Sequence, residues 1–290
     1  MFKAARVSEF FGPWALIPVG FSLLASACAT SSNLATGPRT VNIESGATPA
    51  AAILSSNMTS LLQRTSPSYL TVIVNEKAAS SGAQDRDDIP RALTSGSGFV
   101  VDSAGYLLTA GHVAVKKGNT VDARGSQGRI YQGKVVAIQK SPDIALIKLK
   151  NFSGTPVSPA ASPCIRTGTA LFSLGKPHSQ GDTARIGQLK SMSFGRPVSY
   201  SGFGYPDAMV LRMNTRKGES GGPVFNQQAK LSGMMVSTLS DGKGRSLNLA
   251  HALPVDMLAK FACSKFSCSP AWRRLAASSY KSCKIGKPAS

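Results

Sequence analysis

Acidic residues and histidines are scarce in this sequence. Its 290 residues include 14 Asp and Glu against 33 Lys and Arg, and only three His. Five cysteines are present, but their spacing matches no common zinc finger, and histidine ligands are few. These shortages argue against a structural zinc site, and we expect neither a metal nor another cofactor.

The shortage of acids leaves a formal net charge of +19. Net charge bears on partners more than on fold. A basic protein is attracted to anionic surfaces, so phospholipid headgroups, lipopolysaccharide or an acidic cell wall are candidate envelope partners. The alternative is simply a well-solvated surface. No basic motif interleaved with aromatic residues occurs, so nucleic acid is not an expected partner.

Long hydrophobic runs are also missing. The apolar stretch from Trp14 to Leu24 follows Lys3 and Arg6 and is too short for a comfortable transmembrane helix. This pattern is typical of an export signal, which we place at residues 1–28. Its end, Leu24-Ala25-Ser26-Ala27-Cys28, resembles the lipobox of bacterial lipoproteins. The resemblance implies cleavage before Cys28 and lipidation of that residue.

A lipidated Cys28 implies a membrane-anchored lipoprotein of the bacterial cell envelope, periplasmic or on the surface. Ala25 stands where the lipobox prefers leucine, and ordinary cleavage after Ala27 would give a soluble secreted protein instead. Both interpretations predict export. An even number of further cysteines in an exported chain indicates disulfides. Three pairings are open for Cys164, Cys263, Cys268 and Cys283, and we expect at least one, with Cys283 holding the basic C-terminal tail.

The chain after the signal changes in character twice. Residues 29–50 have hardly any large apolar side chain and predict a flexible tether. Apolar residues at helical spacing over 50–63 predict a short amphipathic helix. Residues 68–74 predict a first strand, and 78–91 predict a polar loop.

From residue 93 to 254 the sequence consists of short β-type runs broken by Gly, Ser, Asp and Pro. Many short strands with turn signals favour barrels or sandwiches over a parallel sheet. Residues 254–261 then predict a closing helix. The clearest predicted strands are 120–123, 130–138, 144–149, 170–174, 209–213 and 231–239.

The stretch Lys217–Phe225 places Ser220 among glycines. Glycine allows a sharp turn and a close approach of backbone to ligand. If the loop curls with its amides inward, the N–H groups of Gly218 and Ser220 form a pocket for an oxyanion, usually the largest single catalytic contribution in acyl transfer. The plain alternative is a tight surface turn.

Two upstream residues complete a candidate catalytic set. His112 follows an apolar β-type run and has small neighbours, so its imidazole is accessible and can accept a serine proton. Asp143 opens the strongly apolar run 144–149, which predicts a buried carboxylate. A buried carboxylate needs a partner, and a histidine N–H is a suitable one.

The order His112, Asp143, Ser220, within the motifs TAGHV, SPDIALIKL and GESGGP, resembles the trypsin-like serine peptidases, most closely the protease domain of the HtrA (Deg) group. Residues 173–177 and 187–189 are similar to a further hairpin of that group. The resemblance covers about residues 65–262. It implies an all-β, chymotrypsin-like fold of two six-stranded antiparallel barrels with a short C-terminal helix, and a catalytic cleft between the barrels.

This resemblance implies a serine endopeptidase in which Ser220 attacks, His112 moves the proton and Asp143 orients the imidazole. We expect unfolded or flexible polypeptides as substrates, and a role in envelope quality control or processing. The oligomeric state stays open, and no PDZ domain is expected. The predicted segments are a signal peptide (1–28), a tether (29–50), the peptidase domain (51–262) and a basic, cysteine-containing tail (263–290).

The resemblance also assigns a substrate pocket, with Asn214 at its base and Val236, Leu249 and His251 in its wall. A neutral base leaves a cationic substrate side chain unpaired, and an apolar wall predicts cleavage after Val, Ala or Leu. His251 is equally well interpreted as core packing. Val236 departs from the family, because many relatives carry there a hydroxyl that supports the catalytic aspartate; Ser237 supplies it if the register differs by one residue.

Other interpretations remain. His178 is expected to be exposed, and Glu219 to be solvated. Residues 218–222 also fit the G-x-S-x-G elbow of α/β-hydrolases, with Asp241 and His251 following, which would make the protein an esterase. The chain lacks the alternating long helices of that fold. A non-catalytic interpretation is a protease-like fold retained as a chaperone or adhesion lipoprotein.

Overall fold

The protein is described by a computed structural model, which covers residues 40–46, 49–76 and 92–283. The predicted signal peptide with Cys28, most of the tether and the polar loop 78–91 lie outside these residues. Within them, no helix combines the length and apolar character needed to cross a membrane.

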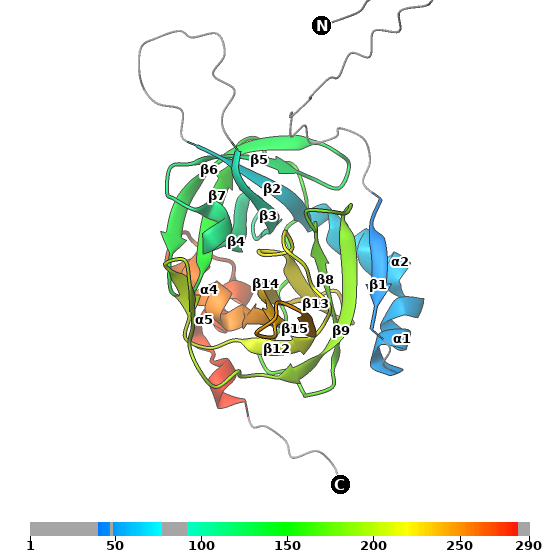
Figure 1. The fold of residues 1–290 in the computed structure, drawn as a ribbon. Helices are drawn as coiled ribbons and strands as arrows, with labels where there is room; N and C mark the ends of the chain where they lie inside the picture. Colours follow the sequence, from blue (N-terminus) through cyan, green and yellow to red (C-terminus); the bar gives the residue numbers. More distant parts are fainter. Residues whose placement is uncertain (1–39, 47–48, 77–91, 284–290) are drawn as a thin grey trace, which may run out of the picture. The chain divides into compact units, whose positions relative to one another are not determined.

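The first half of the described chain forms a closed barrel of six antiparallel strands in the order β2-β3-β4-β7-β6-β5 (Figure 1). Closure leaves no strand edge unpaired. Ile144–Leu149 is buried except at Lys148, so this strand appears in the sequence as a continuous apolar run. The strands are β2 (Tyr69–Asn75), β3 (Ala92–Val100), β4 (Tyr106–Ala110), β5 (Thr120–Arg124), β6 (Ile130–Gln139) and β7 (Ile144–Leu149).

The second half forms another six-stranded antiparallel barrel, β8-β9-β12-β15-β14-β13, which closes between β13 and β8. The two six-stranded barrels expected from the sequence are therefore confirmed. The doubly wound sheet needed for an esterase of the α/β-hydrolase type is absent from the described chain, so that interpretation is wrong. The strands are β8 (Ala170–Gly175), β9 (Thr183–Ser191), β12 (Met209–Arg212), β13 (Pro223–Asn226), β14 (Leu231–Ser240) and β15 (Ser246–Pro254).

Three short strands lie outside the barrels. β1 (Asn42–Ser45), within the predicted tether, pairs in parallel with β9. Part of this segment is therefore a strand added to the second barrel, which the sequence analysis did not predict. β10 (Val198–Tyr200) and β11 (Phe203–Tyr205) form a separate hairpin that contributes to the candidate site.

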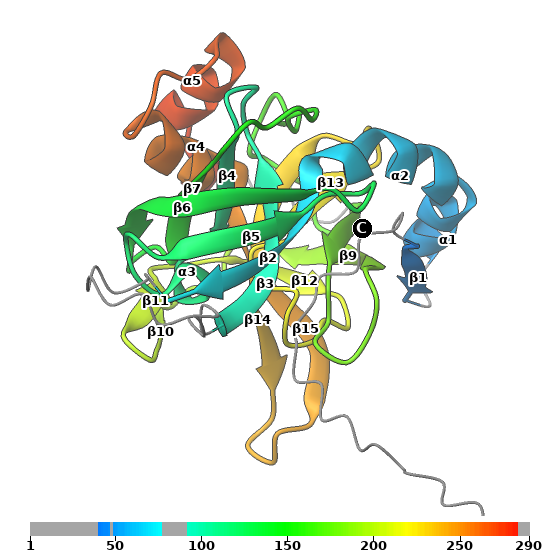
Figure 2. The same cartoon turned by 90° about the horizontal axis from the view of Figure 1, so that it is seen from above.

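The helices lie at the ends of the described chain, apart from one turn in the first barrel. The predicted helix over 50–63 is two helices, and the first contacts β8 and β9 of the second barrel (Figure 2). The predicted closing helix is present and is followed by a second helix that was not predicted. The helices are α1 (Pro49–Ser56), α2 (Met58–Thr65), α3 (Gly111–Ala114), α4 (Val255–Cys263) and α5 (Pro270–Ala277).

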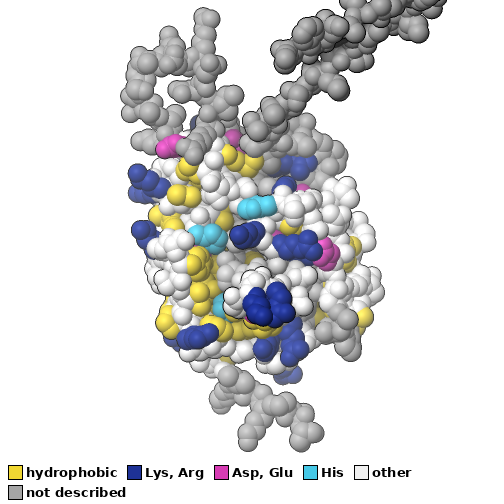
Figure 3. All heavy atoms as spheres, viewed as in Figure 1, with side chains coloured by type: hydrophobic (Ala, Val, Ile, Leu, Met, Phe, Trp, Pro, Cys, Tyr) yellow, Lys and Arg dark blue, Asp and Glu magenta, His cyan; other side chains and the backbone are white. Residues whose placement is uncertain are grey.

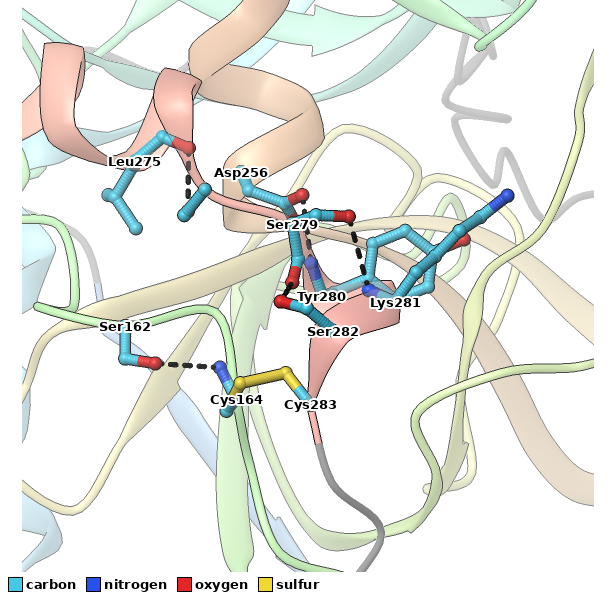
Figure 4. The surroundings of a disulfide bond; sticks show 10 residues. Ser162, Cys164, Asp256, Leu275, Ser279, Tyr280, Lys281, Ser282 and Cys283 are labelled. Carbon is cyan, nitrogen blue, oxygen red and sulfur yellow. Dashed lines mark hydrogen bonds between the residues drawn. A yellow bond between two sulfur atoms is a disulfide. The ribbon is translucent and has the colours of Figure 1, made fainter.

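The four described cysteines form two disulfides, Cys164–Cys283 and Cys263–Cys268. The first connects the loop before β8 to the last described residue, beside Tyr280, whose backbone N–H donates to the Asp256 carboxylate of α4 (3.1 Å; Figure 4). The expectation that Cys283 holds the tail is confirmed. In the described chain no group of three or more His, Cys, Asp or Glu is arranged to hold a metal.

Candidate active site

The three predicted catalytic residues come from both barrels. His112 lies in α3, directly after β4, and Asp143 immediately precedes β7, which pairs with β4 from end to end. Ser220 lies in the loop before β13 of the second barrel. That loop docks on the first barrel, because the Ser97 N–H of β3 donates to the Ser220 carbonyl oxygen (2.9 Å). His112 and Ser220 line one cavity.

The Asp143 carboxylate holds His112 in two places. Its Oδ2 lies 2.6 Å from His112 Nδ1, and its Oδ1 accepts the His112 backbone N–H at 2.7 Å. Asp143 is fully buried, as predicted. The close approach requires a glycine at position 111, since a Cβ there would lie 2.8 Å from Asp143 Oδ1. The imidazole is thus fixed with its Nδ1 proton toward the carboxylate.

A third group on Asp143 was missed by the sequence analysis. Tyr200, at the end of β10, donates its hydroxyl to Asp143 Oδ2, and its ring meets that of His112 edge-on at 5.5 Å between centroids. Burial, and next the Asp143 charge, raise the pKa of the Tyr200 hydroxyl, so it remains a protonated donor. The sequence contains one indication of such a group: Val236 lacks the hydroxyl that the family resemblance implies beside the aspartate. That indication does not identify the residue that donates to Asp143 instead.

Ser237 does not supply that hydroxyl to Asp143. Its Oγ lies 2.7 Å from the Tyr205 hydroxyl instead. The Ser220 hydroxyl donates to the Val236 carbonyl oxygen (3.3 Å), so its proton is not directed at His112 here.

The loop before Ser220 presents two free amides. Among the described residues, neither the Gly218 N–H nor the Ser220 N–H has a hydrogen-bond acceptor. The loop is fixed by its other groups: the Gly218 carbonyl accepts from Ser97 Oγ (3.0 Å), and the Lys217 carbonyl from the His178 N–H (3.0 Å). Gly218 has φ of 100°, and a Cβ there would lie 2.4 Å from the Lys176 carbonyl oxygen. Only glycine fits this position.

Glu219 is buried, so the expectation that it is solvated is wrong. Its Oε1 accepts from Nε of the buried Arg185 of β9 at 2.7 Å, and the Arg185 guanidinium also pairs with Glu44 of β1. Burial raises the pKa of the Glu219 carboxyl, and Arg185 opposes this effect. A buried ion pair therefore fixes Glu219, the residue between the two free amides. This pair joins β9 to the loop, and no local sequence pattern reveals that contact.

The cavity beside Ser220 has a volume of about 770 Å³. Of the four predicted pocket residues, Val236 and His251 line it and Asn214 and Leu249 do not. Asn214 is exposed and accepts from Ser246 Oγ at 3.5 Å. Its assignment and that of Leu249 to the substrate pocket stay predictions. His178 is exposed, as expected.

Comparison with known proteins shows similarity to peptidases. The family model described as "Trypsin-like peptidase domain" matches residues 96–234. The chain is 28% identical over 217 residues to Protease Do-like 5, chloroplastic, of Arabidopsis thaliana, covering 69% of this chain and 66% of that protein. It is 31% identical over 170 residues to the periplasmic serine endoprotease DegP of Salmonella typhimurium, covering 57% and 34%. The chain spans about a third to two thirds of these relatives.

Solved structures support the fold. The HtrA-type protease AlgW with tripeptide matches with a TM-score of 0.59 at 21% identity, covering 72% of this chain and 63% of that one. Rv3671c from M. tuberculosis H37Rv, in an inactive form, matches with a TM-score of 0.58 at 19% identity, covering 78% and 96%. Residues 96–234 thus match a trypsin-like peptidase domain, the described chain has a chymotrypsin-like fold, and the homologues include serine proteases of the HtrA/Deg group.

Proposed function

We propose that the protein is a serine endopeptidase that hydrolyses peptide bonds of unfolded or flexible polypeptides. The observation that carries this proposal is the convergence of His112, Asp143 and Ser220, from two barrels, beside one cavity and two free amides. A trypsin-like peptidase domain and HtrA-type relatives support the same reaction class.

In the proposed mechanism Ser220 Oγ attacks the substrate carbonyl carbon and its proton passes to His112 Nε2. Asp143 keeps the Nδ1 proton in place and stabilises the imidazolium, while Tyr200 donates its hydroxyl to the same carboxylate oxygen, Oδ2. The amides of Gly218 and Ser220 donate to the oxyanion. His112 then protonates the leaving amine, and water releases the acyl group by the same steps.

A second candidate function rests on the Ser220 hydroxyl. Because it donates to Val236 and not to His112, the same geometry fits a protease fold retained as a chaperone or adhesion protein. Catalytic hydrogen bonds are often loose before substrate binds, so endopeptidase activity is the stronger proposal.

Labelling with a fluorophosphonate probe decides between these functions. The probe phosphonylates a serine only when a base and an oxyanion site activate it. We expect labelling of the wild type and none of Ser220→Ala. An unlabelled wild type with the fold intact would contradict the endopeptidase and favour the non-catalytic role.

The envelope location is a further part of the proposal. We propose export, lipidation at Cys28 and anchoring at a bacterial membrane, with a role in quality control or processing of envelope proteins; the net charge of +19 suits an anionic surface. Lys and Arg side chains are spread over the face shown in Figure 3. Metabolic labelling with a palmitate analogue should mark the wild type and not Cys28→Ser. An unlabelled wild type would favour plain secretion.

A further inference from the structure

His251 is a buried histidine with one ring nitrogen in use and the other unpaired. The residue, in β15, is 2% exposed. Its Nδ1 lies 2.8 Å from the Tyr205 hydroxyl, whereas Nε2 is buried with no hydrogen-bond partner among the described residues. An unsatisfied buried polar atom is unfavourable and calls for an explanation. One explanation is that a group of the substrate forms the missing hydrogen bond with Nε2.

The position of His251 favours that explanation. It lines the same cavity as His112 and Ser220, so a substrate held at the nucleophile lies next to it. Its ring is fixed on one side by Phe194, at 4.3 Å between centroids, and on another by the edge-on ring of Tyr205 at 5.7 Å. A ring held this firmly can present one nitrogen in a constant direction.

The hydrogen bonds behind the ring indicate which nitrogen carries the proton. Ser237 Oγ lies 2.7 Å from the Tyr205 hydroxyl, which in turn meets His251 Nδ1. If Ser237 donates to Tyr205 and Tyr205 donates to Nδ1, both hydroxyl protons have acceptors. In the reverse arrangement Nδ1 donates to Tyr205 and Tyr205 donates to Ser237. The Ser237 proton then has no acceptor in the described chain. Burial lowers the pKa of His251 to about 4, so the ring is neutral at pH 7. Its single proton is then on Nε2, as a donor.

The charges around the cavity favour the same kind of ligand. Arg196, Arg216 and Lys217 line it, and no described Asp or Glu does. These cations and the Nε2 donor together attract a side chain that ends in a carbonyl or carboxylate oxygen.

We propose that His251 is a specificity-determining residue of the S1 pocket and selects an acidic or carboxamide side chain, such as Glu or Gln, on the acyl side of the cleaved bond. This inference rests on the proposed endopeptidase function and names its substrate class. It differs from the Val, Ala or Leu preference expected from the sequence. That expectation relied partly on Leu249, which does not line the cavity, and His251 adds a polar group to the wall.

A set of quenched fluorescent peptides that differ only at the residue before the scissile bond tests the inference on the full-length wild type. We expect kcat/KM for Glu, Gln, Asp or Asn to exceed that for Val, Ala or Leu by at least about 10-fold, because a missing acceptor leaves the buried donor unpaired. A preference for Val, Ala or Leu, or for Lys or Arg, overturns the inference.

Two variants and a control locate the effect. His251→Leu should lower the ratio of polar to aliphatic kcat/KM roughly 10²-fold, while Gln132→Leu, at an exposed residue of β6 outside the cavity, should leave the ratio unchanged. Tyr205→Phe, which removes only the hydroxyl behind Nδ1, should lower the ratio less; it serves if His251→Leu fails to fold. If His251→Leu folds and its ratio of polar to aliphatic kcat/KM equals that of the wild type, the inference is overturned. If His251→Leu does not fold, an unaltered ratio in Tyr205→Phe overturns it.

Fluorophosphonate labelling separates this inference from the proposed function. A labelled wild type that cuts after aliphatic residues contradicts only the role of His251. A wild type that is neither labelled nor active on any peptide contradicts the endopeptidase function and this inference with it.

Discussion

Tyr200 donates its hydroxyl to Asp143, the carboxylate that also holds His112. The two residues belong to different parts of the chain, a hairpin outside the barrels and the start of β7. The family resemblance implies a supporting hydroxyl at position 236, where Val236 offers only an apolar side chain. Tyr200 therefore provides the hydrogen bond that this position lacks.

Removing that hydroxyl tests its role. Tyr200→Phe should lower kcat about 10-fold with KM within about 2-fold, because the loss of a hydrogen bond to a charged group loosens the orientation of His112. Steady-state kinetics on one peptide substrate measure both constants. Tyr106→Phe, which removes a hydroxyl from the first barrel outside the site, is the control. A variant with wild-type kcat would mean that Asp143 needs no third partner.

Ser220→Ala should reduce peptide hydrolysis by about 10³-fold or more while the fold persists, because the nucleophile is lost and little else changes. His112→Ala should cause a comparable loss, and Asp143→Asn a large one. Hydrolysis rates and circular dichroism of each purified variant measure activity and folding. Peptidase activity that survives in a clean Ser220→Ala preparation would contradict the mechanism.

The buried pair between Arg185 and Glu219 should be essential for stability. Arg185→Met leaves the Glu219 carboxylate buried without its partner, which costs about 3–5 kcal/mol. Glu219 lies between the two oxyanion amides, so activity should fall as well. Thermal unfolding of Arg185→Met beside Arg212→Met, an exposed cation on β12, measures the difference. Equal melting temperatures would show that the pair contributes nothing.

His251 predicts a pH dependence of stability. Its pKa is about 4 in the folded chain, chiefly because of burial, with Asp207 raising and Arg196 lowering it, whereas an unfolded histidine titrates near ~6.5. The unfolded chain therefore binds a proton between these values that the folded chain does not. This contribution is complete above pH ~6.5 and is lost as pH falls toward 4, by about 3 kcal/mol in all.

Urea unfolding at several pH values between 7.5 and 4 measures that loss. The free energy of unfolding of His251→Phe should fall less steeply with acidification than that of the wild type, and that of His178→Ala should follow the wild type. Parallel curves for wild type and His251→Phe would show that His251 is not held neutral by burial.

The two disulfides should differ in their contribution to stability. Cys164–Cys283 closes a loop of 119 residues and Cys263–Cys268 one of 5. Loop-closure entropy grows with loop length, so replacing Cys164 and Cys283 by Ser should cost about 3–5 kcal/mol, more than the same change at Cys263 and Cys268. Denaturant unfolding of the two double variants gives the comparison, and the reverse order would contradict it.

The sequence alone indicated an all-β chain of barrels or sandwiches and the three catalytic candidates, and the family resemblance implied the two six-stranded barrels. Short apolar runs with turn signals depend on local chemistry, and so do the small residues around His112 and the glycines around Ser220. The apolar run after Asp143 predicted the burial of that carboxylate correctly, because burial of a strand is visible in its own composition.

Only the tertiary structure decided which distant groups meet. The Tyr200–Asp143 contact, the Arg185–Glu219 pair, the added strand β1 and the choice of Cys164 as partner of Cys283 each join segments far apart in sequence. Closure of the barrels and docking of the hairpin create these contacts, and no periodicity or spacing encodes them. His251 is the clearest case: its sequence fits core packing and a pocket wall equally well, and only its place beside Tyr205 and the cavity of Ser220 separates the two.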